Sequence, residues 1–355
     1  MKEYRLMKGN EAIAEAAIRA GADAYFGYPI TPQSEILEYL MEQNPVETTG
    51  MVVLQAESEV AAINMVYGAA CAGRRVITSS SSPGISLKME GISYLAGCEL
   101  PCLIVNIVRG GPGLGTIQPS QADYFQATKG GGHGDYRMLV LAPASVQEMA
   151  DFVTLGFDLA FKYRNPVMIL SDGLIGQMME KVELPEFKPR KTENEPWATV
   201  GKTSDRERNI ITSLNLDALV QERHNIKLQE KYRRMEEEDT RCETTFCDDA
   251  EYIIVAYGAS ARICQKAIKL AREQGIKAGL FRPITLFPFP AKELRAAAKN
   301  AKGLLSVEMS AGQMVEDVRL AVDCSISVKH FGRFGGAVHA PEEILEAISS
   351  LMIEV

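Results

Sequence analysis

The sequence lacks any apolar run that approaches the roughly 18 residues of a membrane span. Its first residues, MKEYRLMKGNEAIAEA, carry acidic side chains where a signal peptide would have an apolar stretch. Positive charge is also in short supply, because 38 Lys and Arg stand against 46 Asp and Glu, for a formal net charge of −8. We therefore expect a cytoplasmic protein that binds neither a nucleic acid nor a membrane surface.

Residues that bind metals are few and scattered. The seven cysteines include no CxxC pair, and the spacings Cys98/Cys102 and Cys242/Cys247 match neither a zinc site nor an iron–sulfur run. The four histidines do not stand in clusters with carboxylates. We interpret the cysteines as reduced structural thiols and expect this chain to bind no metal.

Motifs of the common nucleotide-binding and hydrolytic sites are missing as well. The sequence has no Walker A loop, no GxSxG and no HExxH, and Gly110–Gly115 (GGPGLG) does not have the GxGxxG spacing. Ser171-Asp172-Gly173 resembles the start of the Gly-Asp-Gly…Asn motif that binds a diphosphate with Mg²⁺. Ser171 replaces the first glycine, however, and Asn194 comes too early, so we interpret it as a chance match.

What the sequence does contain is a regular alternation of strand and helix patterns. Hydrophobic residues make up 46% and charged residues 24% of the chain, as in ordinary globular proteins. Strands are predicted at 24–27, 51–54, 76–78, 103–108, 139–141 and 167–170, and helices at 11–20, 33–41, 59–72, 85–96 and 146–161. Strands that alternate with helices predict βαβ units, and hence an α/β fold with a parallel sheet covered on both faces.

Beyond residue 180 the pattern is interrupted and then resumes. Three prolines break up a polar stretch, and one exposed charged helix is predicted over 217–238. The alternation returns with strands at 252–257, 278–281, 304–307 and 325–329, and helices at 260–274, 291–299, 312–322 and 342–351. We predict a first domain over 1–180, a linker with a charged helix over 181–249, and a smaller α/β domain over 250–355.

Four loops that follow predicted strands carry the polar candidates: Gly27–Pro32 (GYPITP), Gln55–Glu59 (QAESE), Thr78–Gly84 (TSSSSPG) and Arg109–Gly113 (RGGPG). Each has an ordinary explanation by itself: Thr31 would cap a helix, and acidic residues favour a first helical turn. An arginine that leaves a core strand, as Arg109 does, can instead hold a carboxylate. Because open α/β sheets bind ligands at the carboxyl ends of their strands, the four loops together predict a ligand site.

These segments resemble the alpha-type subunit of 2-oxoacid:ferredoxin oxidoreductases. The motifs that carry the resemblance are GYPITPQSEI, ESEVAAINMVYGAACAG, TSSSSPGISLKMEGISYLAG, NIVRGGPGLG and QADYFQATKGGGHGDYR. In the last hundred residues, YGASARI, GLFRPITLFPFP and VEMSAGQM resemble the transketolase C-terminal-like domain of that family. The resemblance covers nearly the whole chain outside the charged middle segment, and it implies a pyrimidine-binding domain for thiamine diphosphate over 1–180.

The resemblance also implies a role for each loop. In such pyrimidine-binding halves a glutamate shares a proton with the aminopyrimidine of thiamine diphosphate. The segment SEVAAINMVYG aligns Glu59 with this catalytic and cofactor-binding residue, and Glu57 is the alternative. Thr31 matches a threonine near the substrate, and Arg109 matches the arginine that holds the 2-oxoacid carboxylate. The Ser82–Gly84 turn matches the loop beneath the aminopyrimidine, so Ser82 and Gly84 are cofactor-binding candidates.

The missing motifs then indicate what partner chains supply. Without Gly-Asp-Gly…Asn, the diphosphate and Mg²⁺ half has to come from a thiamine-diphosphate-binding beta subunit, and the iron–sulfur clusters from other chains. The resemblance further implies a gamma subunit, a ferredoxin-like subunit, free ferredoxin and CoA as partners. The expected reaction is the oxidative decarboxylation of a 2-oxoacid with CoA to acyl-CoA, CO₂ and reduced ferredoxin.

The choice of 2-oxoacid rests on the segment after Arg109. It offers apolar residues first and cationic residues late: Leu114, Ile117, Tyr124 and Phe125, then Lys129, His133 and Arg137. A 2-oxoglutarate site has to neutralise a second carboxylate, because an unpaired buried charge is costly. The motifs also resemble the branched-chain subgroup more, so we predict 3-methyl-2-oxobutanoate (2-oxoisovalerate) as substrate. The alternatives are a 2-oxoglutarate subunit, a transketolase-type enzyme acting without ferredoxin, and an inert α/β scaffold.

Overall fold

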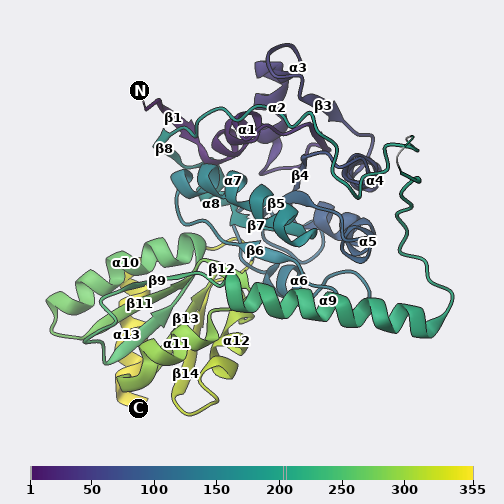
Figure 1. The fold of residues 1–355 in the computed structure, drawn as a ribbon. Helices are drawn as coiled ribbons and strands as arrows, with labels where there is room; N and C mark the ends of the chain where they lie inside the picture. The colour runs from purple at the N-terminus through teal and green to yellow at the C-terminus, as the bar shows by residue number, and fades with distance from the viewer. Residues whose placement is uncertain (1, 203, 205, 355) are drawn as a thin grey trace.

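The computed structural model describes residues 2–202, 204 and 206–354, which form two α/β units stacked on one another (Figure 1). The first unit contains a seven-stranded sheet in the order β12-β6-β7-β5-β4-β2-β3. Its strands are β2 (Ala24–Gly27), β3 (Val52–Gln55), β4 (Val76–Ser80), β5 (Cys102–Val108), β6 (Leu139–Leu141), β7 (Pro166–Asp172) and β12 (Thr285–Phe287). All neighbours are parallel except β12 and β6, so the predicted parallel sheet is confirmed.

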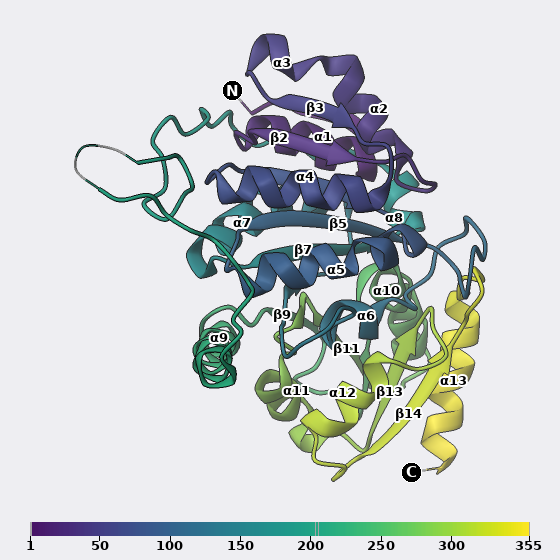
Figure 2. The ribbon, with the colours of Figure 1, turned by 90° about the vertical axis from the view of Figure 1, so that its right-hand side faces the viewer.

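Helices cover both faces of this sheet, as the alternation predicted. On one face lie α1 (Gly9–Arg19), α2 (Ser34–Gln43) and α7 (Val146–Tyr163), and on the other α4 (Glu59–Cys71) and α5 (Pro83–Gly97) (Figure 2). Three short helices complete the unit: α3 (Pro45–Thr48), α6 (Tyr124–Thr128) and α8 (Gly173–Gln177). Strands β4, β5, β6 and β7 are buried over their whole length, which explains the apolar runs of β5, β6 and β7.

The second unit contains a five-stranded sheet in the order β14-β13-β10-β11-β9. Its strands are β9 (Cys242–Thr245), β10 (Tyr252–Val255), β11 (Ala278–Pro283), β13 (Gly303–Glu308) and β14 (Ser327–Gly332), of which only β9 is antiparallel. Its helices are α10 (Gly258–Glu273), α11 (Ala291–Ala297) with the 3₁₀ turn η1 (Ala298–Asn300), α12 (Met314–Ala321) and α13 (Pro341–Glu354). The predicted elements of this region are present, with ends that differ by a few residues.

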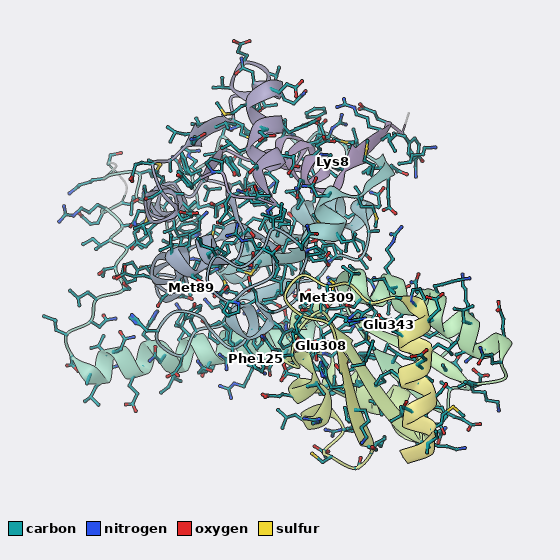
Figure 3. All side chains as sticks on the ribbon, turned by 180° about the vertical axis from the view of Figure 1, so that it is seen from behind. Lys8, Met89, Phe125, Glu308, Met309 and Glu343 are labelled. Carbon is teal, nitrogen blue, oxygen red and sulfur yellow. The ribbon has the colours of Figure 1, made fainter. Side chains whose placement is uncertain are left out.

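The two units share structure where they meet. Strand β12 lies beyond residue 250 yet pairs with β6 of the first sheet. The side chain of Gln121 donates to Tyr257 O and accepts from Ser260 Oγ and Met309 N. Figure 3 shows Met309 and Phe125 at this junction. Sequence patterns did not predict β12, because three residues before a proline are too short to show a period. The division at 180 and 250 stays a prediction.

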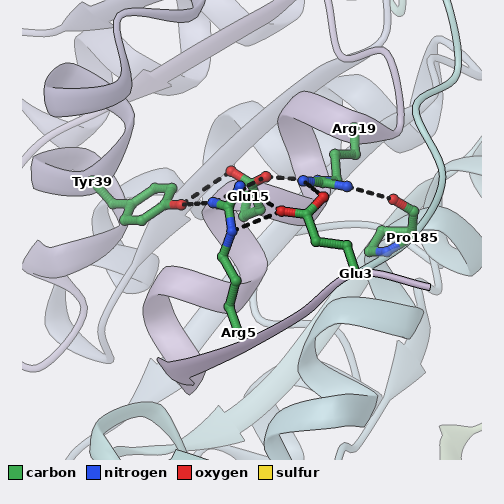
Figure 4. Close-up of polar contacts among 6 residues, drawn as sticks. All are labelled: Glu3, Arg5, Glu15, Arg19, Tyr39 and Pro185. Atoms are coloured by element: carbon green, nitrogen blue, oxygen red, sulfur yellow. Dashed lines mark hydrogen bonds and ion pairs between the residues drawn. The ribbon is translucent and has the colours of Figure 1, made fainter. Parts of the chain in front are cut away.

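Strand β1 (Tyr4–Lys8) pairs with β8 (Met179–Glu183) in a small antiparallel sheet, which the sequence patterns also missed. A charged cluster anchors it: Arg19 binds Glu3 at 2.7 Å and Glu15 at 2.6 Å, and Tyr39 donates to Glu15 (Figure 4). The charged segment forms α9 (Ala218–Glu238), as predicted, and packs through Leu228, Lys231, Tyr232 and Met235. None of the helices among the described residues is long and apolar enough to cross a membrane.

Candidate functional site

The chain changes direction within the first sheet between β2 and β4. From β2 it moves to β3 at the edge, and it then crosses back so that β4 lies on the other side of β2. Open α/β sheets bind ligands at such a switch point, outside the carboxyl ends of the strands. Three of the four predicted loops follow β2, β3 and β4, and the fourth follows the adjacent β5. The fold therefore brings the sequence candidates to one edge.

Glu59 is the buried carboxylate of this edge. It is the first residue of α4, its side chain is 6% exposed, and Ser58 caps the helix by accepting from Ala61 N. The described residues form no hydrogen bond or ion pair with the Glu59 carboxylate. Glu57, two residues earlier, is exposed. Burial therefore distinguishes two glutamates that the sequence left as alternatives.

Gly84 of α5 lies close to this carboxylate. A methyl group at position 84 would clash with Ser80 Oγ and would lie 2.7 Å from Glu59 Oε1. Ser82 precedes it with φ +29° and ψ −84°, a conformation that L residues rarely adopt and that costs about 1–3 kcal/mol. Asn106 holds this turn, because its Oδ1 accepts from Ser82 N and its Nδ2 donates to Asp123.

Arg109 and Thr31 meet beside this turn. Arg109 is buried, and its Nη1 and Nη2 each donate at 2.9 Å, to Thr31 O and to Leu114 O. Arg109 N donates to Ser82 Oγ at 3.1 Å, which ties the two loops together. The suggestion that Thr31 caps a helix was wrong: the cap position of α2 is Gln33, and Thr31 is exposed. Thr31 is left beside Arg109 at the surface of the site.

Unpaired polar atoms gather at this edge. Among the described residues, Ser80 Oγ, Ser81 Oγ and Arg109 Nε are buried without a hydrogen-bond partner, and the Glu59 carboxylate adds two acceptor atoms. Buried polar groups in proteins are nearly always paired, so several unpaired atoms at one sheet edge are typical of a site that a ligand completes. An aminopyrimidine, with an amino donor and ring nitrogens, has the donor and acceptor chemistry that Glu59 and the two serines would match. The residues fit the implied cofactor.

The structure adds a functional candidate that sequence reasoning missed. Lys88 is fully buried on α5, and its ammonium donates to Thr78 Oγ1 at 2.6 Å and to Ser79 O at 3.0 Å. Burial lowers the pKa of Lys88 to about 7, and the charge of Glu59 acts in the opposite direction. The sequence did contain one feature that could have identified Lys88. It lies one helical turn after Gly84, on the same side of an apolar helix.

Several residues of the segment after Arg109 lie away from the site. Tyr124 is fully buried at the junction of the two units, where its hydroxyl donates to Asp317 and its ring packs on Tyr257. It therefore does not line a substrate pocket, contrary to its place among the apolar candidates. Lys129 pairs with Asp317 at 2.5 Å, and the guanidinium of Arg137 lies over Phe287. Leu114 and Ile117 remain exposed near Arg109.

Asp172 of the rejected diphosphate motif has a structural role. Its Oδ1 caps α8 by accepting from Leu174 N and Ile175 N, and its Oδ2 accepts from Ala259 N of the second unit. Burial raises the pKa of Asp172 to about 6. Within the described residues, no group of three or more His, Cys, Asp or Glu side chains is arranged to hold a metal ion.

The helices α4 and α5 are apolar on nearly all sides, although one side of each faces solvent. The exposed apolar side chains are Val60 and Met65 on α4, and Leu87 and Tyr94 on α5. A helix that is apolar all round is typical of one buried between other elements. The surface around Glu59 therefore has the character of a face that another chain covers.

Comparisons with known proteins agree with this arrangement. A family described as "Pyruvate flavodoxin/ferredoxin oxidoreductase, thiamine diP-bdg" matches residues 15–243, and "Pyruvate:ferredoxin oxidoreductase core domain II" matches residues 250–344. The ketoisovalerate oxidoreductase subunit VorB of Methanothermobacter thermautotrophicus is 52% identical over 97% of both chains. The 2-oxoglutarate synthase subunit KorA of the same organism is 37% identical over 98% of this chain and 99% of its own.

A solved structure has the same fold over nearly the whole chain. It is the 2-oxoglutarate:ferredoxin oxidoreductase from Magnetococcus marinus with 2-oxoglutarate, coenzyme A and succinyl-CoA bound, with a TM-score of 0.88 and 27% identity. The alignment covers 99% of the present chain and 66% of that longer chain.

Proposed function

Since this chain belongs to the pyruvate flavodoxin/ferredoxin oxidoreductase family as an alpha-type subunit of the 2-oxoacid:ferredoxin oxidoreductases, we propose that it provides half of a thiamine diphosphate site. The observation that carries the proposal is Glu59, a residue that is 6% exposed and whose carboxylate has no partner among the described residues and lies beside Gly84 at the switch point. When bound, thiamine diphosphate supplies the electron sink for decarboxylation.

Each residue of the site has a task in this proposal. Glu59 holds a proton between its carboxylate and the ring nitrogen of the aminopyrimidine, which only a carboxylate can share. Gly84, where a methyl group would lie 2.7 Å from Glu59 Oε1, would leave room for the ring beside that carboxylate, and the Ser82 turn would form part of the surface that holds the ring. Arg109, already held by the Thr31 and Leu114 carbonyls, presents its unpaired Nε to the substrate carboxylate. Arg109 and Thr31 orient the substrate and form no bond to it.

Partner chains complete the proposed enzyme. The exposed apolar residues of α4 and α5 are the surface on which we place the thiamine-diphosphate-binding beta subunit, with the diphosphate and Mg²⁺. The iron–sulfur clusters and the gamma and ferredoxin-like subunits belong to other chains, and ferredoxin and CoA bind to the assembly in the cytoplasm. In this view residues 1–180 form the pyrimidine-binding domain and 250–355 the transketolase C-terminal-like domain, joined by 181–249.

We propose 3-methyl-2-oxobutanoate as the substrate. The VorB relative, at 52% identity against 37% for KorA, supports this choice. Two of the cationic residues that a second carboxylate would need have partners elsewhere: Lys129 pairs with Asp317, and Arg137 donates to the backbone oxygen of Lys129. Leu114 and Ile117, exposed at the Arg109 loop, supply apolar surface instead.

The test compares substrates on the assembled enzyme. The chain is co-expressed with its partner chains, and kcat/KM is measured for 3-methyl-2-oxobutanoate, pyruvate and 2-oxoglutarate with CoA and a low-potential dye. We expect the branched-chain acid to be preferred. A preference for 2-oxoglutarate contradicts the substrate and leaves the cofactor site in place, whereas absence of turnover with an intact complex favours the inert scaffold.

A further inference from the structure

The chain after Arg109 forms a closed loop over residues 110–118. Its two ends are joined, because Gly110 N donates to Gln118 O at 2.9 Å. The guanidinium of Arg109 donates to Leu114 O at 2.9 Å, in the middle of the loop. The 110–118 loop and the Arg109 guanidinium are therefore connected, so that a displacement of one affects the other.

This loop carries two apolar side chains that the rest of the described chain leaves uncovered. Leu114 is 82% exposed and Ile117 is 57% exposed. Binding residues are disproportionately found on loops that a rigid scaffold holds in place. Because Leu114 O binds the guanidinium that we assign to the substrate carboxylate, the loop lies next to the substrate site. The position of the loop then decides what these two side chains can contact.

A turn of the second unit lies against this loop, between β14 and α13. A methyl group on Gly336 would lie 2.6 Å from Gln118 Cβ and 2.8 Å from Thr116 Cγ2. A methyl group on Gly110 would lie 2.9 Å from Gly336 N. Gly336 also has φ +98°, a left-handed conformation that favours glycine. Only a glycine at position 336 therefore lets the two segments approach so closely.

This contact differs from the rest of the junction between the two units. Gln121, a few residues beyond the loop, joins the units by several hydrogen bonds. By contrast, the described residues form no hydrogen bond between the 110–118 loop and the segment 333–340. Two segments packed this closely leave the loop no room to move toward the second unit. What the contact contributes is therefore the position of the loop.

We propose that Gly336 is a positioning residue for substrate selection, because it fixes the 110–118 loop. In that position Leu114 and Ile117 contact the branched side chain of the 2-oxoacid. The inference rests on the proposed function and deepens it, since it names a part of the second unit that contributes to the choice of substrate. A larger residue at position 336 displaces the loop and removes these apolar contacts, whereas the cofactor site around Glu59 stays intact.

The test measures selectivity on the assembled enzyme. For Gly336→Ala we expect the ratio of kcat/KM for 3-methyl-2-oxobutanoate to kcat/KM for pyruvate to fall about tenfold, because a methylene group in an apolar pocket contributes roughly 10- to 200-fold to discrimination. Most of the change should be in the KM for the branched-chain acid. The affinity for thiamine diphosphate, measured by calorimetry on the same complex, should equal that of the wild type.

Gly335→Ala is the matched control within the same turn. Gly335 has φ +67°, and a methyl group at this position would meet no atom within 4 Å. The substitution therefore adds backbone strain without a contact with the loop, and its selectivity should equal that of the wild type. Hydrogen exchange of a peptide that covers residues 110–118 in the complex should become faster in Gly336→Ala and stay unchanged in Gly335→Ala.

A second background removes the two groups that the added methyl group would meet. In Thr116→Ser/Gln118→Gly both carbon atoms are absent, so Gly336→Ala should change the selectivity much less in this background than in the wild type. An effect of the same size in both backgrounds would contradict a contact with the loop.

The outcomes separate this inference from the proposed function. An unchanged ratio in Gly336→Ala overturns the inference, as does an equal change of the ratio in Gly335→Ala. If Gly336→Ala does not assemble, Leu114→Ala/Ile117→Ala has to lower the same ratio about tenfold, and an unchanged ratio there also overturns it. A wild-type complex that prefers 2-oxoglutarate or shows no turnover refutes the proposed function instead.

Discussion

Two glutamates, Glu59 in the first unit and Glu308 in the second, are buried where a sheet meets the start of a helix. Glu308, labelled in Figure 3, is fully buried. It accepts hydrogen bonds from the hydroxyls of Ser306 and Ser310 and from three backbone amides at the start of α12. Glu59 is 6% exposed, and the described residues give it no hydrogen bond. A buried carboxylate with all its partners stabilises the fold, whereas one with none is available to a ligand.

The comparison predicts the largest loss of activity at Glu59. In the assembled enzyme, Glu59→Gln should lower kcat about 10²–10⁴-fold, because an amide cannot share the proton. The thermal unfolding temperature should hardly change, since no hydrogen bond of the described structure is lost. Steady-state kinetics and calorimetric scans on the same preparation check both points. Glu57→Gln is the matched control, and a larger loss in it than in Glu59→Gln would transfer the role to Glu57.

At Glu308 the expectation is reversed. Glu308→Gln places an amide group among five donors, so the free energy of unfolding should fall by about 2–4 kcal/mol. Activity per folded complex should be retained, because the five hydrogen bonds of the Glu308 carboxylate all come from residues 306–315 of the second unit. Denaturant titration followed by kinetics on the folded fraction checks this. If Glu308→Gln lost activity without losing stability, Glu308 would not have the purely structural role that distinguishes it here from Glu59.

The surroundings of Glu308 also predict a dependence of stability on pH. Burial of His339 lowers its pKa from 6.5 to about 4, so the unfolded state binds the proton more readily than the folded state. Stability from this group is complete above about pH 6.5 and is lost as the pH falls toward 4, by at most about 3 kcal/mol. Unfolding free energies measured across this range should fall less steeply in His339→Asn. If the pH dependence of the unfolding free energy were the same in His339→Asn as in the wild type, groups other than His339 would account for it.

The smallest predicted effect concerns Arg109, on the substrate side of Glu59. Arg109→Lys keeps the charge and loses the fork that holds the Thr31 and Leu114 carbonyls, so kcat/KM should fall about 10- to 100-fold. Most of the change should be in KM, and cofactor affinity should stay near that of the wild type. Steady-state kinetics measure the change in KM, and titration with thiamine diphosphate measures the cofactor affinity. If Arg109→Lys weakened cofactor binding as much as substrate binding, Arg109 would instead help to form the cofactor-binding surface.

Sequence alone determined the α/β class, most elements and the edge at which the candidates meet. Hydrophobic periodicity is a local property, so it predicted strands such as β2 and β6 with their observed ends. The order of loops along the chain then sufficed to place Thr31, Glu59, Ser82 and Arg109 at strand ends, because parallel strands all finish on the same side of a sheet. Strands β9 and β12 were not predicted, because they are short edge strands that form only by pairing with segments distant in the sequence.

Only the tertiary structure decided which candidates are buried and what each one contacts. Glu57 and Glu59 are the same residue type in one short motif, so the sequence does not distinguish them. Their different exposure arises from the packing of α4 on α5. Tyr124 was expected near substrate but contacts Asp317, and Lys88 was overlooked although it lies beneath the site. The physical reason is common to all three: burial and charge–charge interaction depend on residues far away in the chain, and a local pattern carries no information about them.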